Sequence, residues 1–192
     1  MNLFKKIAFT VLLLGVNFSQ AQQSLVYAHD NATFKRAQEL FTAKKYVAAQ
    51  RKFQQAYNAI EEPHSEVKMN AEYYIAVCAL ELFNKDAEYL FIRFIEHHPQ
   101  SPKVRKARYQ LGQYNYRKKR YRSAIKWYEQ VDVNDLEQKE VPEYQFKYGY
   151  SLFRKDKFPE AQKLFHKSKA IESDYQTSAK FYFAHLSYKF NY

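Results

Sequence analysis

The sequence predicts an all-α protein built from repeated helical hairpins, and three observations support this class. The 192 residues include only three glycines and five prolines, which favours helices joined by short turns. Aromatic residues make up 18% of the chain, too many for a disordered protein, so we expect it to fold. Small and aromatic residues also recur together at a spacing close to 37 residues. Such self-similarity indicates a repeat architecture.

The first 21 residues have the layout of a secretory signal peptide. Lys5 and Lys6 precede a short apolar run, and Ser19-Gln20-Ala21 forms a small-x-small cleavage site. We therefore expect export and a mature chain that begins at Gln22. The alternative is an uncleaved N-terminal anchor, but the apolar run is shorter than the roughly 20 residues of a membrane-spanning helix.

The clearest repeat relates residues 109–131 to residues 146–168. Gly112 aligns with Gly149 and Ala124 aligns with Ala161, each at an offset of 37 residues. Further copies occur upstream, and a partial one follows. We place a repeat domain at residues 22–192, with repeats at residues 30–63, 69–99, 105–138 and 142–172 and an incomplete repeat at 177–192.

Each copy carries small residues that allow two helices to approach closely. Aromatic residues lie four positions after the second small residue, one helical turn along the same face. No single hairpin can bury such a face alone, so neighbouring hairpins must stack. The predicted packing residues are Ala37, Ala49, Ala76, Ala87, Gly112, Ala124, Gly149, Ala161 and Ala184.

These landmarks resemble those of the tetratricopeptide repeats, whose period is about 34 residues. The best match is LGQYNYRKKRYRSAIKWYEQ, residues 111–130, and Pro99 sits where such repeats often end. The resemblance implies a right-handed helical-hairpin solenoid of about four and a half repeats that binds protein or peptide. Residues 94–131 are also similar to envelope members of this family from bacteria, of the outer-membrane assembly and division-coordinating type. That similarity implies a place in the periplasm or at the outer membrane.

The same resemblance implies that the first helix of each hairpin lines a peptide-binding groove. Aromatic residues flank the small residue of each first helix, and cations follow in the later copies. The predicted groove residues are Phe34, Phe41, Tyr73, Tyr109, Tyr116, Arg117, Phe146, Tyr150, Phe153, Arg154, Phe181, Tyr188 and Lys189. The alternative is that the aromatics only pad neighbouring helices. The cations favour a ligand with acidic and apolar groups, such as an extended peptide.

The formal net charge of +11 predicts attraction to anionic partners. Because we expect export, we predict no nucleic-acid partner. Residues 103–126 hold ten cations and no acid, whereas residues 129–143 hold six acids and one lysine. These two segments either pair internally or form a docking surface. The basic run RKKRYR, residues 117–122, falls on a turn, and we interpret it as a solvated turn rather than a binding patch.

The sequence predicts no catalytic residue, metal site or cofactor site. His64 and the His97-His98 pair lie in connectors, without a second ligand group at helical spacing. No glycine-rich phosphate loop, nucleophile elbow or zinc-protease motif occurs. Cys78 is the only cysteine, so the chain has no internal disulfide, and we expect a buried, inert thiol.

Together these features predict an exported scaffold that binds a protein or peptide, as part of an envelope or membrane-associated complex. The alternative is a binder of an anionic envelope polymer or glycan, and an enzyme comes last. The final copy has a first helix, about Thr177 to Lys189, but no second helix. Ala184 is nevertheless a small residue suited to a close neighbour, so we expect further repeats or a second chain against this helix.

Overall fold

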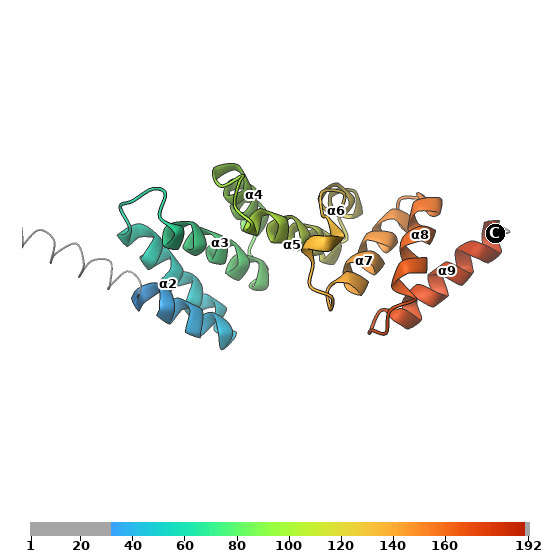
Figure 1. Cartoon of the computed structure of the whole chain (residues 1–192), viewed down its shortest axis with the longest axis horizontal. Coiled ribbons are helices and arrows are strands. Elements are labelled where there is room, and N and C mark those ends of the chain that lie inside the picture. The colour runs from blue at the N-terminus through green and yellow to red at the C-terminus, as the bar shows by residue number, and fades with distance from the viewer. Residues whose placement is uncertain (1–31, 191–192) are drawn as a thin grey trace, which may run out of the picture. The chain divides into compact units, whose positions relative to one another are not determined.

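The computed structural model describes residues 32–190, so the expected signal segment at residues 1–21 lies outside the described part. All regular elements of this part are helices, which confirms the predicted all-α class (Figure 1). The chain divides into two compact units between Leu90 and Phe91. No helix in the described range is long and apolar enough to cross a membrane.

The first unit contains a helix over residues 32–42, followed by α2 and α3. Helix α2 spans Tyr46–Ala59, and α3, which packs against it, spans Glu66–Glu81. Their shared core contains Ala37, Ala49, Phe53, Ile75 and Cys78. The Cys78 thiol is buried, and this desolvation raises its pKa to about 12. The thiol therefore stays protonated and unreactive at neutral pH, as expected from the sequence.

The second unit repeats the helical hairpin. Its elements are α5 (Lys103–Arg117), α6 (Tyr121–Tyr128), the short 3-10 helix η1 (Val133–Asp135), α7 (Val141–Phe153), α8 (Phe158–Ser168) and α9 (Gln176–Phe190). Helix α4 (Ala87–His97) crosses the boundary between the units. Within the second unit α5 packs on α6, α7 on α8 and α8 on α9, and α7 also contacts α5 and α6.

Small residues occupy the closest helix contacts. The structure buries all the predicted packing residues except Ala184, which is exposed on α9. A Cβ atom added to Gly112 would lie 2.5 Å from ring carbons of Tyr128, so this helix contact leaves no space for a side chain. Helix α9 instead buries Ala179 and Leu186 against α8, and Ala184 lies on its other side.

The turn inside each hairpin closes with a left-handed residue that is not glycine. Lys44, Phe83, Lys119 and Asp156 have φ angles of 57°, 56°, 58° and 59°. In each turn the next backbone N–H donates to a carbonyl five residues earlier, for example from Arg120 to Asn115 at 2.9 Å. This bond is the six-to-one bond of the Schellman motif, which usually has glycine at the left-handed position. A side chain there costs about 1–2 kcal/mol.

We expect Lys119→Gly to raise the free energy of unfolding by about 1 kcal/mol, because it removes the left-handed strain. The matched control is Lys118→Gly, since Lys118 has an ordinary φ of −77°. That change brings the entropic cost of glycine and removes the Lys118 ammonium from the Tyr114 ring, 5.5 Å away, so it should lower stability by about 0.5–1 kcal/mol or more. Urea unfolding followed by circular dichroism measures both variants. Equal effects at the two positions would contradict the strain argument.

Candidate functional site

The predicted groove residues differ widely in their exposure. Tyr73, Tyr109 and Phe146 are buried, so these three aromatics serve as packing residues. Phe34 and Phe41 are half-buried, and each contacts the rings of Phe53 and Tyr74 at centroid distances between 5.2 and 6.4 Å. Phe34 and Phe41 therefore pack against a neighbouring helix, and each keeps part of its surface exposed.

A row of half-buried tyrosines crosses the first helices of the second unit. Tyr116 on α5, Tyr150 on α7 and Tyr182 on α9 form this row, called here the tyrosine ladder. The ring centroids of Tyr116 and Tyr150 lie 5.9 Å apart, and those of Tyr150 and Tyr182 lie 5.3 Å apart. Tyr121 stands beside the ladder, 6.1 Å from Tyr116 and 5.8 Å from Tyr150. The ladder thus connects three successive hairpins.

Burial raises the pKa of Tyr116, Tyr121 and Tyr182 above the usual tyrosine value. Neighbouring tyrosines raise each of these pKa values further, because two phenolates would repel one another. The hydroxyl groups therefore remain neutral at physiological pH. A neutral phenol both donates and accepts a hydrogen bond, so this row offers apolar ring surface together with polar contacts.

Exposed cations lie at the ends of first helices, over aromatic residues of the preceding turn. The Arg154 guanidinium lies 4.9 Å from the ring centroid of Tyr121, and its Nη1 donates to the Tyr121 and Tyr150 hydroxyls, each at 3.4 Å. The Lys189 ammonium lies 4.7 Å from the ring of Phe158. Each cation therefore stacks on the turn aromatic one hairpin earlier, while it remains accessible to solvent. Arg117 occupies the matching position on α5 and is also exposed.

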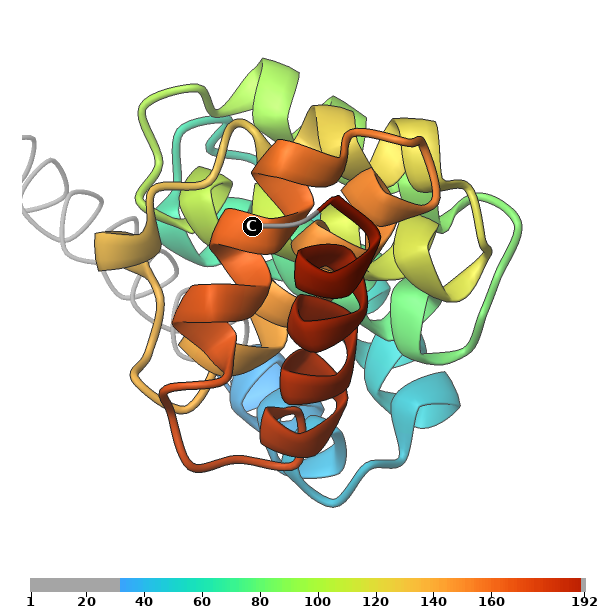
Figure 2. The same ribbon diagram turned by 90° about the vertical axis from the view of Figure 1, so that its right-hand side faces the viewer.

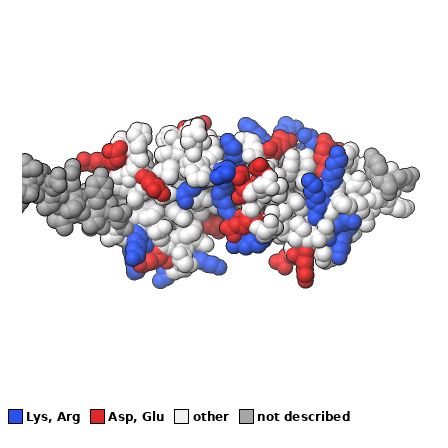
Figure 3. All heavy atoms as spheres, in the orientation of Figure 1, with Lys and Arg blue, Asp and Glu red and all other residues white. Residues whose placement is uncertain are grey.

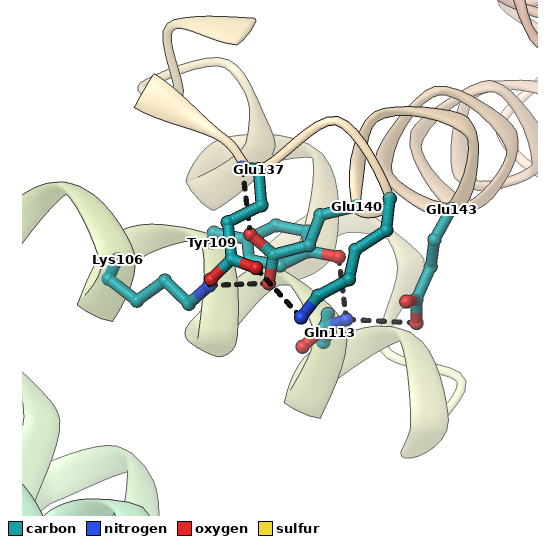
Figure 4. A network of polar contacts seen from close by, with 7 residues as sticks. Lys106, Tyr109, Gln113, Glu137, Glu140 and Glu143 are labelled. Atoms are coloured by element: carbon teal, nitrogen blue, oxygen red, sulfur yellow. Dashed lines mark hydrogen bonds and ion pairs between the residues drawn. The ribbon is translucent and has the colours of Figure 1, made fainter. Parts of the chain in front are cut away.

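Polar contacts also join α5 to the start of α7 and to the residues just before it. Figure 4 shows Lys106, Tyr109 and Gln113 of α5 directed towards Glu137, Glu140 and Glu143. The Gln113 amide donates to the Glu143 carboxylate at 2.9 Å and to the Tyr109 hydroxyl at 2.8 Å. Lys106 pairs with Glu140. These contacts hold the two first helices in a fixed register.

Lys147 of α7 adds a mostly buried cation to this network. Its ammonium pairs with Glu143 and lies 5.5 Å from the ring of Tyr116 and 5.8 Å from the ring of Tyr175. Burial and then the Glu143 carboxylate raise the pKa of Tyr175 to about 12. The sequence interpretation did not single out Lys147 or Tyr175. Neither residue occupies a position that recurs in every repeat, and both act through contacts between neighbouring hairpins, which the sequence does not show.

The basic and acidic segments noted in the sequence pair internally in part. Arg105 forms an ion pair with Asp135 at 2.8 Å, and Lys106 lies 3.8 Å from Glu137 in addition to its pairing with Glu140. Figure 3 shows basic and acidic side chains interleaved around α5 and the start of α7. The acids at residues 135–140 therefore neutralise cations of α5. The cations of residues 117–120 remain exposed at the turn.

Solved structures with the same fold identify the type of repeat. The nearly identical TPR-like repeats of a Podosopora anserina protein, named as a kinesin light chain, align with a TM-score of 0.60. Sequence identity is 12%, and the alignment covers 82% of this chain and 85% of that one. A single-substitution variant of the same protein gives a TM-score of 0.61, with 84% of it covered. The fold is a tetratricopeptide-like helical repeat.

At 12% identity these structures establish the fold alone. The sequence itself matches no known family model and no curated protein. Tetratricopeptide-like repeats commonly serve as scaffolds that bind other proteins, because stacked first helices present one continuous surface. In this chain the tyrosine ladder and the cations beside it lie on those helices.

Proposed function

We propose that this protein is a non-catalytic scaffold that binds an extended segment of another protein along the first helices of its second unit. The observation that carries the proposal is the tyrosine ladder with Arg154 held beside it. Half-buried rings on three successive first helices, α5, α7 and α9, present apolar surface at regular spacing. Networks at α5 and α7 fix the helices that carry them. A preorganised surface binds a flexible segment at a lower entropic cost.

The chemistry of this surface favours a ligand with both apolar and acidic groups. Apolar side chains fit against the ring faces of the ladder, and the neutral hydroxyls hydrogen-bond to a peptide backbone. Arg154 and Lys189 are exposed and charged, and each is held in place by stacking on an aromatic ring. A cation fixed in this way binds a carboxylate with little further loss of side-chain freedom.

Charge reversal at the ends of the first helices tests this binding surface. We expect Arg117→Glu/Arg154→Glu/Lys189→Glu to weaken binding of a synthetic peptide of alternating glutamate and leucine by at least about tenfold, while helix content stays unchanged. The matched control is Lys118→Glu/Lys119→Glu/Arg120→Glu, which makes the same charge change in the turn. It should weaken binding much less. Calorimetric titration measures affinity, and circular dichroism measures helix content.

Equal affinity of the wild type and the first triple variant would contradict the proposed surface. An equal loss in the two triple variants would indicate attraction by net charge alone. Retention on purified cell-wall polymer, without any peptide binding, would instead favour the glycan alternative raised by the sequence.

We further propose that the scaffold acts in the bacterial cell envelope, in the periplasm or at the outer membrane. Support comes from the first 21 residues, in which two lysines, an apolar run and Ser19-Gln20-Ala21 follow one another as in a signal peptide. N-terminal sequencing of the protein from an envelope fraction should give Gln22 as the first residue. An intact Met1 on the exported protein would contradict cleavage.

A further inference from the structure

Helix α9 presents an aromatic face that no other part of residues 32–190 covers. Phe181 is 64% exposed and Tyr188 is 88% exposed, and the exposed Ala184 lies between them on the same face. In Figure 2 this helix, in dark red, lies nearest the viewer. Its opposite side packs on α8 through Ala179, Leu186 and the half-buried Tyr182.

The same triplet of aromatic, small and aromatic residue occurs on the first helices of the two preceding hairpins, where a second helix covers it. On α5 the triplet is Tyr109, Gly112 and Tyr116, and α6 packs against it with Ala124 and Tyr128, both fully buried, while Tyr116 stays half-buried. The missing Cβ of Gly112 brings the Tyr128 ring directly onto the α5 backbone.

On α7 the triplet is Phe146, Gly149 and Phe153. Helix α8 covers it with Ala161 and Phe165, which are also fully buried. Both covering helices therefore place an alanine and, four residues later, an aromatic ring against the triplet. Phe181, Ala184 and Tyr188 form the same surface, and no helix of residues 32–190 covers it.

We propose that the outer face of α9 is a docking site for an amphipathic helix of a partner protein, with a small residue followed four positions later by Phe or Tyr. The aromatic ring would pack against Ala184, with Phe181 and Tyr188 on either side. The matching contacts are those of the Tyr128 ring with Gly112 and of the Phe165 ring with Gly149.

The basic side chains of α9 indicate the charge of the partner helix. Helix α9 contains Lys180, His185 and Lys189 and no acidic residue, and all three basic side chains are exposed. A second copy would bring the same cations face to face, in a chain whose formal net charge is +11. An acidic helix of a partner protein complements this charge. This site uses the outer side of α9 and does not depend on the tyrosine ladder.

A helical peptide tests the proposal with the full chain. The probe is a lactam-bridged peptide of about 14 residues, with a central alanine, phenylalanine four residues later and flanking glutamates. Fluorescence anisotropy should show saturable binding, and Ala184→Arg should weaken it at least about tenfold. Ala184 is exposed, so this variant folds. If the attraction were only electrostatic, the added cation would strengthen binding instead of weakening it.

Two controls separate this site from others. Ala170→Arg adds the same charge at an exposed position outside α9 and should retain binding. Arg117→Glu/Arg154→Glu changes the first-helix surface and should also retain it, so failure of the two proposals can be told apart. Three results would overturn the α9 proposal. They are equal binding by wild type and Ala184→Arg, no saturable binding up to about 1 mM peptide, and a homodimer in sedimentation that Ala184→Arg abolishes.

Discussion

Ala124→Arg is expected to lower the free energy of unfolding by about 3 kcal/mol or more. Ala124 is fully buried on α6, in a core with Tyr109, Tyr128, Leu136 and Tyr144. The residues packed around Ala124 in this core are aromatic and aliphatic. The arginine must therefore separate α6 from α5 or bury an uncompensated charge, and both outcomes are costly.

Urea unfolding followed by circular dichroism measures this loss. The matched control is Ala184→Arg, which makes the same substitution at a predicted packing residue that the structure leaves exposed on α9. Its effect should stay within about 0.5 kcal/mol, because surface substitutions away from packed contacts are usually mild. An unchanged melting temperature for Ala124→Arg would mean that the assigned register of the third repeat is wrong.

The helical class follows from the sequence because its determinants are local and periodic. Small residues at fixed offsets and aromatics one turn away require two helices to meet, whatever else surrounds them. The left-handed conformation of the turn residues could not be predicted from the sequence. These positions hold two lysines, a phenylalanine and an aspartate, and none is the glycine that usually marks such a turn.

The candidate binding surface was only partly predictable. Residue spacing predicts which side chains share one face of a helix, but it does not predict whether another helix packs on that face. Tyr109 and Phe146 occupy the same repeat position as Phe181, yet the first two are buried and the last is 64% exposed. The difference is the set of neighbouring helices: the Tyr109 ring lies 6.4 Å from Tyr144 of α7 and the Phe146 ring lies 5.9 Å from Phe165 of α8. Tyr182 of the ladder was missed because it lies one residue after the repeating landmark. Its ring contacts Tyr150 of α7 and Phe165 of α8, and contacts between helices cannot be predicted from the residue spacing within α9.

Gly112→Ala is expected to destabilise the protein by about 1–3 kcal/mol, even though alanine is about 1 kcal/mol better than glycine in a helix interior. The new methyl group would lie 2.5 Å from two ring carbons of Tyr128. The Tyr128 ring is fully buried and is held by the rings of Tyr144 at 5.6 Å and Tyr148 at 5.7 Å. It therefore cannot swing away without disturbing the core.

Gly149→Ala provides the matched comparison, because it makes the same substitution one repeat later. There the added Cβ would meet Leu164 at 3.1 Å and Phe165 at 3.2 Å, contacts that a shift of a few tenths of an ångström relieves. The gain in helix propensity then offsets the strain, and the net change should lie within about 1 kcal/mol of zero. Thermal and urea unfolding of the two variants give the comparison. Equal losses at both glycines would contradict the specific clash with Tyr128.

A double-mutant cycle locates the cost of Gly112→Ala in the Tyr128 ring. Tyr128→Leu removes the ring carbons that the new methyl group would meet, although it is itself destabilising because it leaves a cavity. In that background Gly112→Ala should cost less than in the wild type, with a coupling of about 1 kcal/mol or more between the two positions. Additive effects would show that the methyl group is accommodated by another route. A positive coupling ties the repeat's small residue to the aromatic ring of its covering helix, which is the contact that the uncovered face of α9 lacks.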